Sequence, residues 1–150
     1  MVQPVNLHAT ALVVGTAGLL VTGRSGAGKS TLALAILDHH RNRHVFAALV
    51  ADDRVWVDVR HGRLVASVPH SIAGLVEVWG FGPSPVAHEG RAVIDGVVAL
   101  VDAEAAPRYR GDEMETILGV DLPRLDIAER GTIAATQAIT SWVRSTLGCR

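Results

Sequence analysis

The stretch that decides the fold is residues 19–37, LLVTGRSGAGKSTLALAIL. The apolar residues at its beginning come after another apolar run, residues 11–14. The turn-forming residues 15–18 (GTAG) separate the two runs. Two short apolar runs around such a segment predict a β-hairpin. From Ser30 onward the residues are dense in helix formers, so a helix is expected there. The sequence therefore predicts a hairpin, then a glycine-rich loop, then a helix.

The glycine-rich loop, residues 23–30, reads GRSGAGKS and matches the P-loop pattern G-x-x-x-x-G-K-[S/T]. In such a loop the backbone N–H groups and the helix N-terminus bind an anion, the lysine reaches phosphates, and the serine can ligate Mg²⁺. The expected nucleotide-binding residues are Gly23, Arg24, Ser25, Gly26, Ala27, Gly28, Lys29, Ser30 and Thr31.

The basic residues of the chain are almost all arginines. Of the 14 Lys and Arg residues, Lys29 is the only lysine, and it falls inside the P-loop pattern. A chain that otherwise uses arginine for positive charge has a compact ammonium at the position that must reach between phosphates. The position of this lysine supports the nucleotide-site interpretation.

Composition limits the classes of protein that the chain can represent. With 150 residues, 49% hydrophobic and 19% charged, residues 1–150 are expected to form one globular domain. A net charge of −1 and few aromatic residues argue against a nucleic-acid partner. The single cysteine, Cys149, excludes an intrachain disulfide. No signal peptide or membrane-spanning run is recognisable at the start, so we expect a cytoplasmic protein without membrane contact.

The remaining chain is predicted as strands, loops and one further helix. The helix is expected over residues 132–147, with its apolar side (Ile133, Ile139, Trp142, Val143 and Leu147) packed on the sheet. The predicted strands are residues 45–51, a hairpin of 55–59 with 64–68, residues 75–78, and residues 92–101. Loops are expected at residues 80–85, where glycines and prolines gather, and in the charged, exposed connection 102–115.

Several polar residues near these elements are candidates for chemistry. Asp52 and Asp53 end the apolar strand that follows the predicted helix, where a nucleotide site needs a carboxylate for Mg²⁺. If the backbone stays extended there, the two side chains point to opposite faces, so one could serve a metal and the other a proton. Glu77 could be an outward-facing strand residue or a metal ligand. His8, just before the first strand, is by itself an ordinary surface histidine.

Taken together, these motifs resemble the catalytic domain of HPr kinase/phosphorylase, a bacterial protein-serine kinase that acts on the phosphocarrier HPr. The family has a histidine ahead of the hairpin, the P-loop, a Val-Ala-Asp-Asp strand end and a Glu-Ile-Arg-Gly-Leu-Gly signature. Here these are His8, residues 23–30, residues 50–53 and, as EVWGFG, residues 77–82. The resemblance covers residues 8–125. It implies an α/β P-loop domain with a mixed β-sheet, similar to the nucleotide domain of phosphoenolpyruvate carboxykinase.

The resemblance also implies roles for individual residues. Ser30 and Glu77 would bind Mg²⁺, and we expect Asp52 to contribute to the same metal site. Asp53 would be the base for the substrate serine, with His8 assisting beside it. In the reverse reaction of bifunctional members, inorganic phosphate attacks the phosphoserine and Asp53 returns the proton.

The remaining expectations from the resemblance concern ATP, a further arginine and partners. ATP would be bound by the P-loop with Lys29. A catalytic arginine is expected after the glycine-rich signature, for which Arg108 is the first candidate and Arg110 the second. HPr or a related phosphocarrier would be the protein partner, and a homo-oligomer is expected because the family is usually hexameric.

The chain departs from the family pattern in three places. Trp79 replaces the signature arginine, residues 83–85 (PSP) replace an aliphatic continuation, and the later phosphorylase segment is reduced to residues 122–126 and 129–131. Typical members also have an N-terminal domain, so the chain resembles a short form with the catalytic domain only. These departures weaken the expectation of dephosphorylation.

The sequence is therefore compatible with three functions. The first is an ATP- and Mg²⁺-dependent serine kinase for HPr or a related phosphocarrier. The second is an ATP-binding regulatory module that has lost phosphotransfer, which Trp79 and the reduced C-terminal segment motivate. The third is a small-molecule kinase, whose lid would be the arginine-poor connection 102–115.

Overall fold

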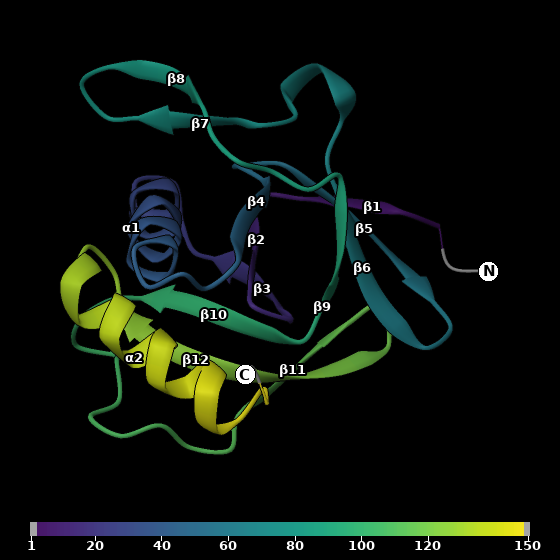
Figure 1. Ribbon diagram of the computed structural model, residues 1–150. Coiled ribbons are helices and arrows are strands. Elements are labelled where there is room, and N and C mark those ends of the chain that lie inside the picture. The colour runs from purple at the N-terminus through teal and green to yellow at the C-terminus, as the bar shows by residue number, and fades with distance from the viewer. Residues whose placement is uncertain (1–2, 149–150) are drawn as a thin grey trace.

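The computed structural model describes residues 3–148, so Cys149 lies outside the described residues. Its elements form three layers (Figure 1): two helices, a six-stranded sheet and a four-stranded sheet, with a separate two-stranded ribbon at one end. The helices are α1 (Lys29–Arg41) and α2 (Thr132–Ser145), and one 3-10 turn covers His70–Ile72. This arrangement is the α/β fold with a mixed sheet that the sequence predicts.

The six-stranded sheet lies in the middle of the molecule. In spatial order its strands are β11 (Met114–Ile117), β12 (Val120–Ala128), β10 (Gly96–Val101), β3 (Ala17–Thr22), β2 (Thr10–Val14) and β4 (Ala47–Ala51). β10 runs parallel to β3 and to β12, whereas the other neighbouring pairs are antiparallel. The predicted first hairpin is confirmed as β2 and β3, with residues 15–16 as its turn.

The four-stranded sheet and the ribbon complete the fold. The sheet consists of β1 (Val5–Leu7), β5 (Val55–Arg60), β6 (Arg63–Ser67) and β9 (Arg91–Ile94), all antiparallel neighbours. The pair of β5 and β6 confirms the second predicted hairpin. The ribbon consists of β7 (Leu75–Val78) and β8 (Gly82–Pro85).

The central sheet is covered on both faces, which explains why its strands are continuous apolar runs. Successive side chains of a strand point to opposite faces. In β3, Leu19 and Val21 join the core beneath the helices, while Leu20 joins the core against the four-stranded sheet. Val98 and Val97 of β10 divide between the two cores in the same way.

Both helices bury one side against the central sheet and against each other. The buried apolar residues of α1 recur every three or four positions: Leu32, Ala33, Ile36 and Leu37. The buried side of α2 includes Ile139, Trp142 and Val143, as predicted. Ile133 departs from the prediction and is 80% exposed. It precedes Ile139 by more than one and a half turns, so it lies on the far side of the helix.

The prediction of a loop at residues 80–85 is wrong, because residues 82–85 form β8. In the ribbon Pro83 pairs with Glu77, and Pro85 pairs with Leu75. The two prolines are two residues apart, so both lack their N–H on the same side of the strand. The described part of the chain adds no third strand to the ribbon, and an edge strand tolerates proline on the side without a partner.

The prediction of a single strand at residues 92–101 is also wrong, because the chain bends there from one sheet into the other. β9 belongs to the four-stranded sheet and β10 to the six-stranded sheet. At the bend Asp95 exchanges two hydrogen bonds with Gly18, through its carboxylate (2.9 Å) and its backbone N–H (2.7 Å). A Cβ at Gly96 would lie 2.6 Å from the ring of Trp142, so α2 packs directly on the bend.

Besides β8, three strands were not predicted from the sequence: β1, β11 and β12. β12 contains Pro123, which lowers its strand signal. Its pairing with β10 begins only at Arg124, so the missing N–H of Pro123 breaks no bond of that ladder. The connection predicted at residues 102–115 is mostly exposed, but β11 begins within it at Met114. Within residues 3–148, neither helix is long and apolar enough to cross a membrane.

Candidate active site

The glycine-rich loop, residues 23–30, joins β3 to α1 as predicted. Gly28 precedes the helix with φ of 94°, a left-handed conformation that favours glycine. The first turn of α1 has neither a capping side chain nor an acidic residue. Its backbone N–H groups therefore give this end of the helix a positive partial charge. Such a helix end favours an anion.

Lys29 is a nearly buried cation, with 5% of its surface exposed. Its Nζ donates hydrogen bonds to the carbonyl oxygens of Gly23 (2.8 Å) and Arg24 (3.0 Å). Among residues 3–148, no carboxylate lies within ion-pair distance of this ammonium group. A buried charge without an opposite charge is unfavourable, so Lys29 provides a place for an anion beside the loop.

Asp52 accepts hydrogen bonds from three elements that meet beside the loop. Its Oδ1 accepts from the hydroxyl groups of Ser30 (2.7 Å) and Thr10 (3.1 Å). Its Oδ2 accepts from the backbone N–H of Glu77 (3.2 Å), in β7. The structure thus brings together the three residues predicted for the metal: Ser30, Asp52 and Glu77. Thr10, which the sequence analysis did not single out, belongs to the same network.

Asp53 faces a different partner from Asp52. Its Oδ1 lies 2.5 Å from Nε2 of His8, and the two side chains are 61% and 50% exposed. The condition for the expected opposite faces, an extended backbone, is not met, because Asp53 is left-handed with φ of 68°. The backbone N–H of Asp53 donates to the hydroxyl oxygen of Thr10 (3.3 Å), which itself donates to Asp52. The two aspartates are tied together at Thr10 yet have separate partners.

A cavity of about 140 Å³ lies where these elements meet. Its lining combines residues of the loop, the start of α1, the end of β4 and the ribbon: Ser25, Gly26, Gly28, Lys29, Ser30, Thr31, Asp53, Glu77 and Trp79. Most of these residues are the predicted nucleotide and metal residues. Trp79 stands at the edge with 81% of its surface exposed. We call this space the loop cavity.

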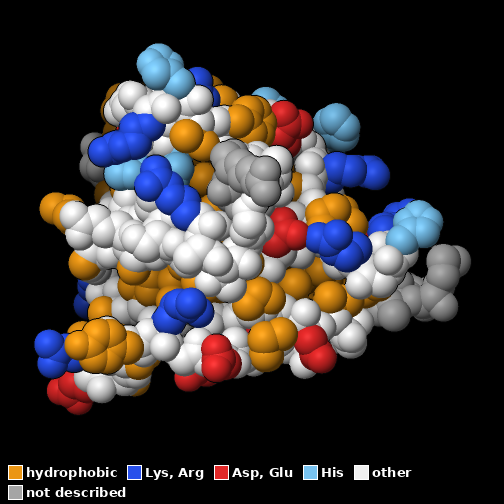
Figure 2. Space-filling model, turned by 60° about the horizontal axis from the view of Figure 1, so that its bottom comes forward, with side chains coloured by type: hydrophobic (Ala, Val, Ile, Leu, Met, Phe, Trp, Pro, Cys, Tyr) orange, Lys and Arg blue, Asp and Glu red, His pale blue; other side chains and the backbone are white. Residues whose placement is uncertain are grey.

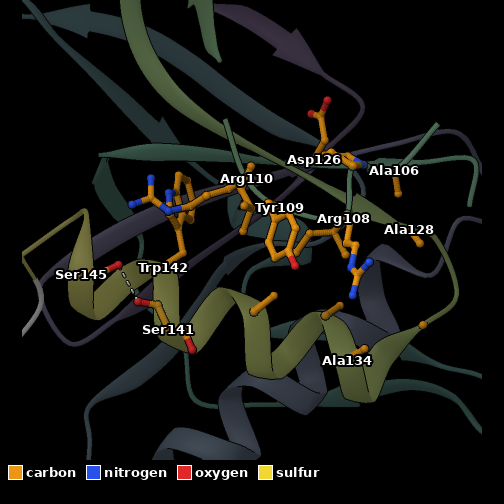
Figure 3. Close-up of a pocket in the computed structure, with 16 residues that line it drawn as sticks. Ala106, Arg108, Tyr109, Arg110, Asp126, Ala128, Ala134, Ser141, Trp142 and Ser145 are labelled. Atoms are coloured by element: carbon orange, nitrogen blue, oxygen red, sulfur yellow. Dashed lines mark hydrogen bonds between the residues drawn. The ribbon is translucent and has the colours of Figure 1, made fainter. Parts of the chain in front are cut away.

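Arg108 and Arg110, the predicted catalytic arginines, line a different cavity of about 410 Å³. Figure 3 shows them on the 102–113 segment, which passes over α2 near Ala134 and Trp142. The guanidinium of Arg108 lies 5.4 Å from the ring centre of Tyr109. On the face that includes α2, positive and negative side chains are interspersed among hydrophobic ones (Figure 2). The structure does not bring either arginine to the loop cavity. We call this second space the helix cavity.

Two residues at the end of β12 contact the glycine-rich loop and were not predicted as site residues. Glu129 accepts hydrogen bonds from the guanidinium of Arg24, and the backbone N–H of Arg130 donates to the carbonyl oxygen of Ala27 (3.1 Å). The sequence showed these residues only as part of a shortened C-terminal segment. Arg24 and Glu129 lie 105 positions apart in the sequence, so local sequence patterns could not predict their contact.

The fold and the site define a class: α/β proteins in which a glycine-rich loop joins a central strand to a helix beside a pair of carboxylates. The family model described as "HPr Serine kinase C-terminal domain" matches residues 1–145. The chain belongs to this family.

Relatives and a solved structure agree with the match. An HPr kinase/phosphorylase of Clostridium tetani is 40% identical over 126 residues, 81% of this chain and 38% of that protein. One of Geobacter sulfurreducens is 31% identical over 138 residues, 83% of this chain and 41% of that protein. The chain thus spans about two fifths of the length of these curated relatives. The structure of the Hpr(Ser) kinase/phosphatase from Coxiella burnetii has a TM-score of 0.79 and 25% identity, covering 95% of this chain and 99% of that one.

Proposed function

We propose that the chain is an ATP- and Mg²⁺-dependent kinase that phosphorylates a serine of HPr or of a related phosphocarrier. One observation carries the proposal: two carboxylates of one loop are divided between two partners at the loop cavity. Asp52 binds the hydroxyl of Ser30, at the start of α1, and Asp53 binds His8, at the exposed side. A kinase needs this division, because one carboxylate holds the metal and the other takes the proton of the attacking hydroxyl.

The residues around the loop fit the phosphates of a nucleotide. Lys29 is a nearly buried ammonium whose partners within residues 3–148 are carbonyl oxygens of its own loop. The uncapped start of α1 adds backbone N–H groups on the same side. Both features are satisfied by an anion with several oxygens, and nucleotide phosphates have that chemistry.

The donor set also fits Mg²⁺, which prefers hard oxygen ligands and binds through one or two carboxylates together with substrate phosphates. Ser30 and Glu77 line the loop cavity and supply a hydroxyl and a carboxylate, and Asp52, which accepts hydrogen bonds from the Ser30 hydroxyl and the Glu77 backbone, supplies a second carboxylate beside it. When bound, the metal would neutralise charge on the transferring phosphoryl group. Within the described residues, no three His, Cys, Asp or Glu side chains form a metal cluster by themselves, so substrate oxygens would complete the coordination.

His8 and Asp53 would handle the proton of the serine hydroxyl. A carboxylate accepts hydrogen bonds, so Nε2 of His8 carries the proton that it donates to Oδ1 of Asp53. Oδ2 receives no hydrogen bond from the described residues, so this oxygen is left to accept the serine proton. As the serine oxygen bonds to the γ-phosphorus, the bond from phosphorus to the β-phosphate oxygen breaks and ADP leaves. Lys29 and the loop amides would stabilise the charge on the transferring group.

The test compares phosphotransfer by the wild type and by Asp53→Asn, with Mg·[γ-³²P]ATP and the HPr of the same organism. Removing a general base lowers a rate by about 100-fold or more, so we expect labelled HPr to fall by that factor in the variant. The affinity for Mg·ATP should change less than about 2-fold, because Asp53 does not contact the loop amides or Lys29. Asp58→Asn, which alters a carboxylate paired with Arg60 on β5, is the matched control. Undiminished transfer by Asp53→Asn would contradict the proposal.

A second candidate function is a regulatory module that binds ATP without transferring phosphate. The exposed Trp79 supports it, because an aromatic ring at the loop cavity cannot supply the hydrogen bonds of the arginine in the family signature. The same assay separates the two. Binding of Mg·ATP by the wild type without label on HPr would favour the module.

A further inference from the structure

The end of β12 holds the glycine-rich loop through both the side chains and the backbone of two consecutive residues. Nε and one terminal nitrogen of Arg24 donate to the two carboxylate oxygens of Glu129, the Nε bond being 3.0 Å long. The next residue, Arg130, donates its backbone N–H to Ala27 O (3.1 Å) and its Nε to Gly26 O (3.2 Å). Four hydrogen bonds thus connect this pair to one short loop.

The sheet topology explains why these residues meet. β3, β10 and β12 are parallel neighbours, so their carboxyl ends lie at the same edge of the sheet. β3 leads into the loop, β10 leads to Asp102, and β12 leads to Glu129. Oδ1 of Asp102 lies 3.4 Å from a terminal guanidinium nitrogen of Arg24. The backbone N–H of Glu129 donates to the carbonyl oxygen of Val101 (2.8 Å). The contact is therefore built on the carboxyl ends of three neighbouring parallel strands.

The pair of Arg24 and Glu129 is charged and partly shielded from water. The side chain of Glu129 is 8% exposed, whereas that of Arg24 is 61% exposed. The hydrogen bond from Arg24 lowers the pKa of Glu129, burial of the carboxylate opposes this shift, and the charges of Arg24 and Arg130 lower the pKa further. Glu129 is therefore ionised at neutral pH, and the bidentate geometry fixes the direction of the Arg24 side chain.

These contacts determine how the loop presents its backbone. In a trans peptide the carbonyl oxygen and the N–H point in opposite directions. Because Arg130 holds the carbonyl of Ala27, the N–H of Gly28 in the same peptide is directed away from β12. The carbonyl of Arg24 accepts from Nζ of Lys29, so fixing Arg24 also fixes a partner of that ammonium group. Arg130 adopts φ of 64°, an uncommon value for a residue with a side chain.

We infer that Glu129 and Arg130 are positioning residues for the phosphate-binding loop: they hold residues 24–27 so that Gly28 N–H and Lys29 meet a polyphosphate. The nature of the ligand rests on the proposed function. The contact itself does not, because its four hydrogen bonds join residues of this chain only. Glu129 and Arg130 of the shortened C-terminal segment therefore contribute to nucleotide binding, and this role is separate from dephosphorylation.

The test measures Mg·ATP affinity by calorimetry for the wild type, Glu129→Ala, Glu129→Gln, Arg130→Ala and Arg130→Lys. Losing a charge-assisted hydrogen bond typically weakens binding by about 10-fold, which we expect for Glu129→Ala. Arg130→Ala should weaken binding less, because its backbone bond to Ala27 remains, and Arg130→Lys should recover part of the loss. Glu104→Ala, which removes the same group from the exposed 102–113 segment, is the matched control and should bind like the wild type.

Two further measurements separate positioning from general stability. In a double-mutant cycle, Arg24→Ala, Glu129→Ala and the double variant should lose similar affinity, because each breaks the same contact. In the nucleotide-free protein, the amide resonances of Gly26 and Gly28 should shift in Glu129→Gln, a variant that keeps the size of the side chain. The melting temperature of that variant should stay within a few degrees of the wild type.

The outcomes distinguish this inference from the proposed function. Unchanged Mg·ATP affinity and unchanged glycine resonances in Glu129→Gln and Arg130→Ala would overturn the positioning role while leaving the kinase proposal intact. A wild type that binds no Mg·ATP, but whose glycine resonances respond to Glu129→Gln, would overturn the kinase proposal and support the contact between β12 and the loop.

Discussion

The loop cavity and the helix cavity differ in a way that shows what identifies a site. The helix cavity is the larger, about 410 Å³, and is lined mostly by apolar and small side chains of α2 and the 102–113 segment. The loop cavity has about 140 Å³, yet a buried ammonium, two carboxylates and the start of a helix converge on it. Convergence of polar groups from several elements, rather than volume, marks the place where chemistry is proposed.

The largest expected effect comes from removing the buried charge of the loop cavity. Lys29→Met keeps the length of the side chain but leaves a bound polyphosphate without its ammonium partner. We expect the Mg·ATP affinity, measured by calorimetry, to fall by about 100-fold or more, the usual cost of leaving one partner of a buried charge pair alone. Arg41→Met, at the other end of α1, is the control. Wild-type affinity in Lys29→Met would remove the main reason for placing the nucleotide in the loop cavity.

A smaller effect is expected from the hydroxyl that links α1 to Asp52. Ser30→Ala removes a proposed metal ligand and one of the three hydrogen bonds of Asp52. The Mg²⁺ concentration for half-maximal transfer to HPr should rise by about 10-fold, an effect typical of lost metal-site partners. Ser30→Thr keeps the hydroxyl and should behave like the wild type, and Ser141→Ala on α2 should have no effect. An unchanged Mg²⁺ requirement would place the metal elsewhere.

The smallest effect on nucleotide binding is expected from the helix cavity. Arg108→Ala should change the Mg·ATP affinity by less than about 2-fold, because its guanidinium lies beside Tyr109 and away from the loop cavity. Titrations with a fluorescent ATP analogue can resolve this difference. The catalytic role that the family resemblance implies for Arg108 would show as a lower kcat alone. A large loss of affinity would mean that the 102–113 segment folds over the loop cavity.

Local sequence patterns predicted the elements that form the floor of the loop cavity. The hairpin of β2 and β3, the loop of residues 23–30 and the helix from Lys29 follow from short-range spacing and glycine placement. Asp52 and Asp53 were found because they end a strand, a position that depends only on the neighbouring residues. Such features need no knowledge of which distant segments pack together.

The features that sequence patterns missed depend on tertiary packing. Proline suggested a loop at residues 82–85, but a strand with one free side accommodates it. Residues 92–101 are apolar except for Asp95 and Gly96, a pair typical of turns, and the chain bends at this pair, where Trp142 packs on Gly96. Glu129 and Arg130 reach the loop because parallel strands end at a common edge, which a linear reading does not show.

The bend at Asp95 and Gly96 has a consequence for how the protein unfolds. It joins β9 of one sheet directly to β10 of the other, and its two bonds to Gly18 and its contact with Trp142 tie it to β3 and to α2. No flexible linker separates the layers at this point. Because each sheet supplies one of the two strands joined at the bend, we expect the layers to unfold as one cooperative unit rather than as modules that melt in turn.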